Sequence, residues 1–171
     1  MISFAQAQDN LHQLCRTWVA THPDVSEPLA LCESLGRYLN EDVIAALELP
    51  RSDISAMDGY AICSQDREGT LTSQVFTLKG ESRAGEPYSG DPLAPGECVR
   101  IFTGAVVPES ADTVVIQENV ERDNTSVRML QGTSFGANIR RRGEEIAAHS
   151  AIAIAGQLIT PNMIPLLASQ G

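Results

Sequence analysis

The sequence predicts an α+β protein in which a β-rich domain is inserted into an elongated, mostly helical domain formed by both chain ends. Three observations favour this fold class. The first 20 residues have helical apolar periodicity, the middle is rich in glycine, proline and short β-type runs, and the tail returns to a helical pattern. We expect the helical domain to comprise residues 1–47 and 141–171, and the β-rich domain residues 48–140.

The N-terminal segment is predicted to be an amphipathic helix. One face carries its apolar residues at helical spacing, namely Phe4, Ala7, Leu11, Leu14, Cys15, Trp18 and Val19. Ser3 and Gln6 have the spacing of a capping box, which indicates a helix start. Thr21–Pro28 should end this helix, a second short helix is predicted over Leu31–Leu39, and an extended segment follows over Asp42–Leu49.

The central part of the chain is predicted to form a small β sandwich or barrel. Ten of the 13 glycines lie between Gly59 and Gly143, with several prolines among them. Short runs of β-forming residues separate these turns, at Gln74–Leu78, Glu97–Phe102, Thr113–Gln117 and Ser126–Leu130. Many short strands punctuated by glycine and proline are typical of such all-β modules.

The C-terminal segment returns to the helical domain. Ala151–Ala155 is a short extended apolar run. Thr160 and Pro161 suit the N-cap and first turn of a helix that would end near Ser169, with Gly171 at the C-terminal cap. We therefore expect the two chain ends to be built together.

Composition limits the partners of this chain. Its 171 residues are 43% hydrophobic, which is enough for a core, and carry a formal net charge of -10. Such an acidic chain is a poor general partner for nucleic acid or an anionic membrane. Because we find no signal peptide or membrane-spanning apolar run, we expect a cytoplasmic protein. The four cysteines lack metal-ligand spacing, so no metal site is predicted.

The segment Ser52–Ile62 is the first candidate for a functional site. It places Asp58 in an Asp-Gly turn between apolar neighbours, which a solvated loop rarely carries. A carboxylate held in this way presents one charge at a fixed place. An ordinary structural Asx turn uses the same dipeptide, so the local sequence leaves both interpretations open.

Two further segments carry groups suited to anions. Arg100–Pro108 begins as a strand and ends in a Thr-Gly turn, which would leave the Thr103 hydroxyl and nearby N–H groups free for an anion, unless the turn is merely structural. Asn138–Glu145 contains the arginines Arg140–Arg142, which either pair with nearby acids or reach an oxyanion. Nucleotide-binding, hydrolase and zinc-protease signatures are missing, and these residues do not make a complete catalytic constellation.

A resemblance to a known family is carried by four segments in order, SAMDGYA, RAGEPY, RIFTGAVVP with ADTVVIQE behind it, and NIRRRGEE. The chain resembles the N-terminal half of molybdopterin molybdenumtransferases, the MoeA family, which includes the C-terminal region of gephyrin. The similarity extends from the first predicted helix to the closing LLASQG. One departure is Ile54, where the family usually has asparagine, so we expect no polar side-chain contact from that position.

The resemblance also implies an activity. The family transfers molybdenum from molybdate to adenylylated molybdopterin, with Mg2+-dependent release of AMP, in a cleft between the protomers of a homodimer. A MogA-like α/β domain and a C-terminal β-barrel follow in the family and are absent from this sequence. We therefore expect an N-terminal fragment that is inactive alone, with Mg2+ and molybdate bound mainly outside it. A MogA-like adenylyltransferase is implied as a partner.

Carried over by motif, the resemblance implies catalytic roles for Asp58 and Thr103, and oxyanion or substrate contacts from Arg140, Ser55 and Gly104. It implies no metal ligand here. The leading hypothesis is a fragment of a molybdenum insertase that contributes one wall of an active site. The alternative is a non-catalytic dimerisation or scaffold module of the gephyrin type. A self-contained Asp-dependent hydrolase is disfavoured, because no second acid or metal cluster stands at a defined spacing.

Overall fold

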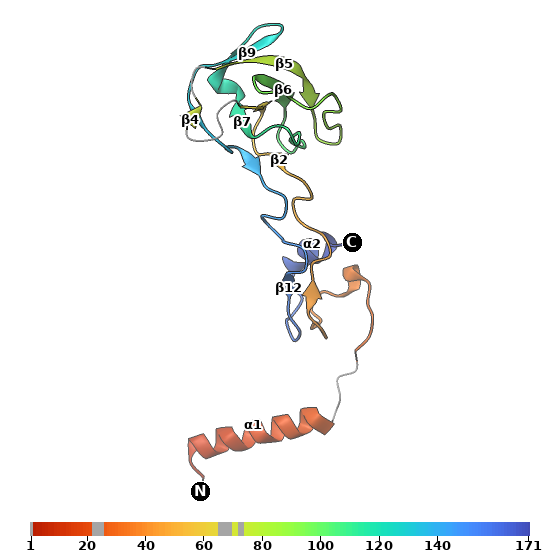
Figure 1. Cartoon of the computed structure of the whole chain (residues 1–171). Coiled ribbons are helices and arrows are strands. Elements are labelled where there is room, and N and C mark those ends of the chain that lie inside the picture. Colours follow the sequence, from red (N-terminus) through yellow and green to blue (C-terminus); the bar gives the residue numbers. More distant parts are fainter. Residues whose placement is uncertain (1, 22–25, 65–69, 72–73) are drawn as a thin grey trace. The chain divides into compact units, whose positions relative to one another are not determined.

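The computed structural model describes residues 2–21, 26–64, 70–71 and 74–171 (Figure 1). The described residues are mostly β, with two α-helices, so the helical share is smaller than the sequence predicts. The chain divides into two compact units. The first comprises residues 1–42, 153–169 and 171, and the second comprises residues 43–152 and 170.

Helix α1 (Phe4–Thr21) confirms the predicted N-terminal helix. Its capping box is present, since the Ser3 N–H donates to Gln6 Oε1 at 2.9 Å and the Gln6 N–H donates to Ser3 Oγ at 3.2 Å. No residue of α1 is buried. The predicted break over Thr21–Pro28 falls partly on residues outside the described ranges.

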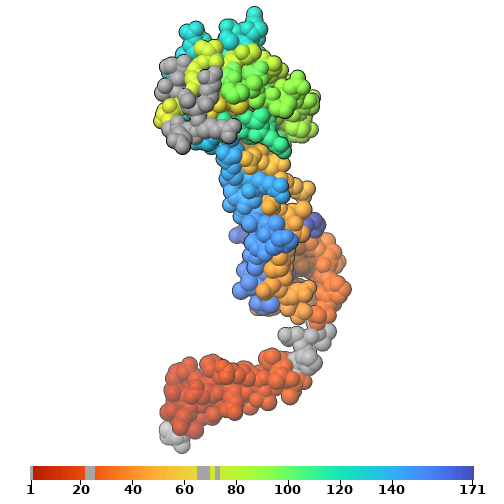
Figure 2. Space-filling view, viewed as in Figure 1, coloured from red at the N-terminus to blue at the C-terminus, as the bar shows by residue number. Residues whose placement is uncertain are grey.

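The prediction of a second helix over Leu31–Leu39 is wrong. Only a 3-10 turn, η1 (Leu31–Glu33), is formed, and Gly36 adopts a φ of 78°. The backbone beyond it pairs with the C-terminal segment, because the Gly36 N–H donates to Ile159 O at 3.0 Å and the Leu39 N–H donates to Gln157 O at 3.0 Å. These contacts between residues 36–39 and 157–159, in the orange and blue segments that lie side by side in Figure 2, take the place of helical hydrogen bonds.

The C-terminal helix α2 (Met163–Ala168) begins later than predicted. Its N-cap is Asn162 and makes no side-chain capping bond, so the assignment of Thr160 as N-cap is wrong. Instead, Thr160 O accepts the Met163 N–H at 3.0 Å in a turn that precedes the helix.

The second unit is organised around a six-stranded sheet with the order β7-β3-β6-β5-β9-β8. Its strands are β3 (Gly59–Ile62), β5 (Val75–Ser82), β6 (Glu97–Ile101), β7 (Thr113–Ile116), β8 (Val120–Arg122) and β9 (Ser126–Met129). Four of them, β5, β6, β7 and β9, confirm the four predicted β runs. All neighbours are antiparallel except β5 and β6, which are parallel.

The sheet must curl, because its two edge strands are joined by a very short link. Strands β7 and β8 lie at opposite edges, yet only the 3-10 turn η2 (Gln117–Asn119) separates them in the chain. Four residue steps reach at most about 14 Å, whereas the edges of a flat six-stranded sheet are about 24 Å apart. The curled sheet agrees with the barrel-like module that the sequence predicts.

Both faces of the sheet are buried, as the alternation of side chains along β3 shows. Tyr60 and Ile62 pack in one apolar cluster around Phe76, whereas Ala61, together with Cys63 just after the strand, packs in a second cluster. Because successive side chains of a strand point to opposite faces, a strand that is buried throughout must have core on both sides. The interior strands are therefore held rigidly.

Three two-stranded ribbons complete the described chain. They are β1 (Val43–Ile44) with β12 (Ala151–Ala153), β4 (Thr70–Leu71) with β10 (Thr133–Ser134), and β2 (Ile54–Ser55) with β11 (Ile139–Arg140). The ribbon β2–β11 helps to position the candidate site, since β2 leads directly into the segment that carries Asp58. None of the helices in the described ranges is both long and apolar enough to cross a membrane.

Candidate functional site

The topology of the sheet brings three of the sequence motifs to one end of it. Gly59, the first residue of β3, pairs with Ile101 at the end of β6 and with Ile116 at the end of β7. Because β5 is parallel to β6, it ends at the same place, with Ser82 opposite Ile101. The residues that precede β3 and follow β5, β6 and β7 therefore meet at this end.

Asp58 and Thr103 form a hydrogen-bonded pair at this end of the sheet. The backbone N–H and the hydroxyl of Thr103 both donate to Asp58 Oδ1, each at 2.8 Å. No described residue donates a hydrogen bond to the second carboxylate oxygen, and Thr103 itself is exposed. The structure thus joins the two residues proposed as catalytic, which are 45 positions apart in the chain.

The pair keeps the Asp58 carboxyl ionised. The hydrogen bond from the Thr103 N–H lowers its pKa most, followed by the bond from the Thr103 hydroxyl, while partial desolvation opposes them and the charge of Arg100 adds to the lowering. A carboxylate with a lowered pKa is a weak base at neutral pH. Its arrangement suits orienting a donor group of a ligand better than removing a proton from a weak acid.

Gly59 is needed here for a reason other than a turn. The Asp-Gly pair predicts a glycine at positive φ, but Gly59 is not among the glycines with positive φ and begins strand β3. A Cβ at this position would lie 2.0 Å from Val115 O on the neighbouring strand β7. The glycine therefore permits a close approach of two backbones beside Asp58.

Ser55 and Gly104 hold the two turns together. The buried Ser55 hydroxyl donates to Met57 O at 2.6 Å and accepts the Met57 N–H at 3.3 Å, which fixes the turn that leads to Asp58. The Gly104 N–H donates to Ser55 O at 2.9 Å. Gly104 has a φ of 81°, so a side chain would be strained there. These contacts stabilise the turns that carry Asp58 and Thr103, and a direct contact of Ser55 or Gly104 with an oxyanion stays a prediction.

Arg140 lies on strand β11, opposite Ile54 of β2. Its guanidinium forms ion pairs with Glu144, at 3.7 Å, and with Glu145. The structure therefore realises the internal pairing that the sequence left open for this arginine. Within the described ranges its guanidinium forms no hydrogen bond or ion pair with Asp58 or Thr103, so a role in binding an oxyanion would require its present ion pairs to rearrange.

The other two arginines of the run also pair with acids. Arg141 Nη1 lies 2.6 Å from Asp53 Oδ2, the Arg142 N–H donates to Asp53 Oδ1 at 2.8 Å, and the Arg142 guanidinium pairs with Glu48. Burial pushes the pKa of Asp53 up, but the hydrogen bonds from Arg142 and Arg141 together bring it below its ordinary value. This run ties the segments on either side of the ribbon β2–β11.

Arg100, which lies beside Asp58, was not among the residues singled out from the sequence. This half-buried side chain donates from Nη1 to Gly59 O at 3.2 Å and from Nη2 to Gln117 Oε1 at 2.6 Å. Its guanidinium carbon lies 5.1 Å from the centre of the Tyr60 ring and 4.8 Å from that of Phe102. An arginine between the buried residues Val99 and Ile101, in the strand run ECVRI, was the available signal.

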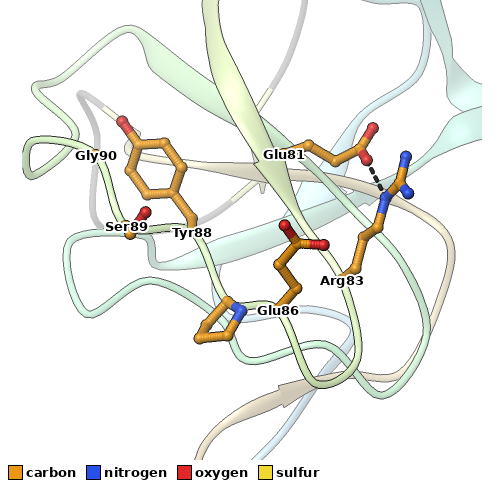
Figure 3. A pocket seen from close by; sticks show the side chains of 7 residues that line it. Glu81, Arg83, Glu86, Tyr88, Ser89 and Gly90 are labelled. Carbon is orange, nitrogen blue, oxygen red and sulfur yellow. Dashed lines mark hydrogen bonds and ion pairs between the residues drawn. The ribbon is translucent and has the colours of Figure 1, made fainter.

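A polar cavity of about 440 Å³ opens at the motif RAGEPY, after β5. Figure 3 shows Arg83 turned toward Glu81, with which it forms an ion pair, and the Tyr88 ring beside Gly90. The cavity is lined by Glu81, Arg83, Glu86, Pro87, Tyr88, Ser89 and Gly90. The Arg83 guanidinium also lies 5.8 Å from the centre of the Phe102 ring, on which Arg100 packs as well, so the cavity lies close to Arg100.

The described ranges contain no site for a metal ion. No group of three or more histidine, cysteine, aspartate or glutamate side chains in them is arranged to hold one. Mg2+ prefers several oxygen ligands in near-octahedral geometry, and Asp58 alone does not provide them. These residues therefore do not fit a Mg2+ centre.

Comparisons with known proteins agree on one family. Residues 2–171 match the MoeA N-terminal region (domain I and II). The chain is 37% identical over 150 residues to a molybdopterin molybdenumtransferase of Haemophilus influenzae, covering 87% of this chain and 36% of the relative. It is 37% identical over 142 residues to molybdopterin molybdenumtransferase 2 of Mycobacterium tuberculosis, covering 82% and 35%.

A solved structure shows the same fold. The crystal structure of the molybdopterin biosynthesis moeA protein from Pyrococcus horikoshii superposes with a TM-score of 0.74 at 29% sequence identity, covering 85% of this chain and 38% of that one. The chain thus spans about a third of the length of the curated relatives it matches. The match over residues 2–171 places this chain in the family of MoeA N-terminal regions.

Proposed function

We propose that this chain contributes one wall of the active site of a molybdenum insertase, which transfers molybdenum from molybdate to adenylylated molybdopterin and releases AMP. The observation that carries the proposal is the Asp58–Thr103 pair at the end of the sheet. The relatives are named for molybdenum transfer to molybdopterin, which supports the reaction class.

Asp58 orients the substrate, and Thr103 keeps the Asp58 carboxylate in place. The Thr103 N–H and hydroxyl occupy one carboxylate oxygen, so the other oxygen of Asp58 can accept a hydrogen bond from a ligand group. The donors of the exposed Thr-Gly turn are already engaged, because Thr103 donates to Asp58 and the Gly104 N–H donates to Ser55 O. Binding of an oxyanion such as molybdate or phosphate at this turn would therefore exchange one of these hydrogen bonds for a bond to the ligand. Residues outside this chain would complete the site and hold Mg2+.

The experiment is complementation of a bacterial strain that lacks molybdenum insertase. A chimera in which this chain replaces the matching region of the H. influenzae relative should restore a molybdenum enzyme, whereas the chain alone should not. Asp58→Asn in the chimera should lower the restored activity at least tenfold, because a hydrogen bond to a charged group contributes about 1.5–3 kcal/mol. Asp91→Asn, a matched change at an exposed aspartate, should leave it intact.

A non-catalytic dimerisation or scaffold module is the second candidate function, and helix α1 favours it. The helix exposes Phe4, Leu11, Leu14 and Trp18 by 60–80% each. An apolar helix face of this kind is typically covered by a partner. We propose that the protein is a cytoplasmic homodimer in either function. A MogA-like adenylyltransferase would supply its substrate.

One measurement tests dimerisation, and a second separates the two functions. Sedimentation at tens of micromolar should show a dimer that Leu14→Glu disrupts and that Gln13→Glu, on the opposite face of α1, leaves intact. A monomeric wild-type chain would contradict dimerisation through α1. Full rescue by the Asp58→Asn chimera would instead contradict the catalytic role of Asp58 and leave the scaffold function as the explanation.

A further inference from the structure

Arg100 stands at the centre of the segments that carry the candidate site. It lies on β6, opposite Tyr60 of β3 in the strand register. The guanidinium therefore packs on the Tyr60 ring, and it also packs on Phe102, the residue directly before Thr103. These contacts tie the side chain to the strand that follows Asp58 and to the turn that contains Thr103.

The hydrogen bonds of Arg100 reach both sides of Asp58. Nη1 donates to the carbonyl of Gly59, the next residue, at 3.2 Å. Nη2 donates to Gln117 Oε1 at 2.6 Å, and the Gln117 backbone N–H donates to Asp58 O at 3.0 Å. One guanidinium thus connects the ends of β3, β6 and β7 around the Asp58 carboxylate.

Arg100 forms no ion pair with a carboxylate of the described residues. Within the described ranges no carboxylate lies within ion-pair distance of it, whereas Arg83 and Arg140 each have an acid partner. A planar guanidinium can donate in two fixed directions while its faces stack on rings, which an ammonium cannot do. Arg100 meets both geometric demands, because it donates two hydrogen bonds and its face stacks on rings. It is therefore suited to hold the ends of β3, β6 and β7 in place.

We propose that Arg100 is a positioning residue, which holds the Asp58–Thr103 pair in register by joining Gly59, Phe102 and Gln117. This deepens the proposed function and rests on it for its catalytic meaning. The positioning itself is measured on the 171-residue chain without substrate. A failed chimera would therefore count against the function and leave the positioning result unaffected.

The test follows the Thr103 amide by NMR hydrogen exchange in the wild-type chain, Arg100→Met and Arg100→Lys. Both variants should exchange this amide roughly tenfold faster, which corresponds to the loss of about one net hydrogen bond. The carboxyl pKa of Asp58, read by carbon NMR, should rise toward its ordinary value in both. Unchanged protection of Val99, buried in the middle of β6, would show that the sheet is intact.

Controls separate positioning from charge and from stacking. Arg83→Met removes the other guanidinium over Phe102 without touching Gly59 or Gln117, and should leave Thr103 exchange unchanged. If Arg100→Met does not fold, the milder Gln117→Ala, at an exposed residue, should still raise the exchange rate about threefold. The proposal is overturned if Arg100→Lys matches wild type, if Arg83→Met equals Arg100→Met, or if Thr103 exchange is unchanged in Gln117→Ala.

Discussion

The close approach at Gly59 makes a quantitative prediction about stability. In Gly59→Ala the new Cβ would lie 2.0 Å from Val115 O, 2.9 Å from Val115 C and 3.1 Å from Ile116 Cα. All three atoms belong to the backbone of β7, which cannot swing aside as a side chain does. To reach an ordinary separation of about 3.5 Å, β3 and β7 must move apart by roughly 1.5 Å.

That movement has a calculable consequence. Backbone hydrogen bonds of about 2.9 Å would stretch well beyond 3.5 Å, and each costs about 0.5–1.5 kcal/mol net when lost. Strain from overpacking adds about 1–3 kcal/mol. We expect Gly59→Ala to lower the free energy of unfolding by about 2–4 kcal/mol, measured by urea denaturation with far-UV circular dichroism.

Gly85→Ala is the matched control. Gly85 has a φ of 81°, and a methyl group on its Cα would meet no atom within 4 Å, so only backbone strain, about 1 kcal/mol, should appear. The prediction is refuted if Gly59→Ala lies within about 0.5 kcal/mol of the parent chain, below the typical cost of a core clash. It is equally refuted if Gly85→Ala is the more damaging change.

Three further predictions concern single side chains. Thr103→Val removes the hydroxyl donor and should raise the pKa of Asp58 toward its ordinary value in a carbon NMR titration. Asp53 has a lowered pKa, so its stabilisation is present above its unfolded pKa, near pH 4, and is lost as the pH falls through the folded pKa. Asp53→Asn should therefore cost up to about 1 kcal/mol at pH 7 in urea denaturation, and the difference from the parent should shrink as the pH falls through the folded pKa. Burial raises the pKa of Cys98 to about 12, so mass spectrometry should find this thiol unlabelled by maleimide in the native chain, whereas the exposed Cys15 is labelled.

Local patterns predicted the strands because their β-forming residues stand in short continuous runs between glycine and proline turns. β6 and β7 match their predicted runs to within a residue, since their β-branched residues fill both faces of the sheet. The failure over Leu31–Leu39 has a non-local cause. Its backbone bonds to residues 157–159, more than a hundred positions away, and no local periodicity carries that information.

The candidate site, too, could be predicted only where local sequence carries the information. Asp58 and Thr103 could be chosen from their motifs, but their contact depends on the register of β3 against β6. Arg100 was missed because its hydrogen-bond partners lie 41 and 17 positions away. The role of Gly59 was assigned to a turn, because sequence alone does not separate a glycine needed for positive φ from one needed for a close backbone approach.

The pairing of β3 between β6 and β7 also determines when this site can form during synthesis. Strand β3 leaves the ribosome first, yet both partners follow later in the chain, the last of them ending at Ile116. At about 5–20 residues per second, the apolar segment Gly59–Ile62 waits roughly 3–12 s for its second partner. During that interval it is an unpaired hydrophobic strand, open to chaperones or to other nascent chains. The segment that follows Asp58 is therefore exposed to aggregation in the newborn chain until Ile116 has been made.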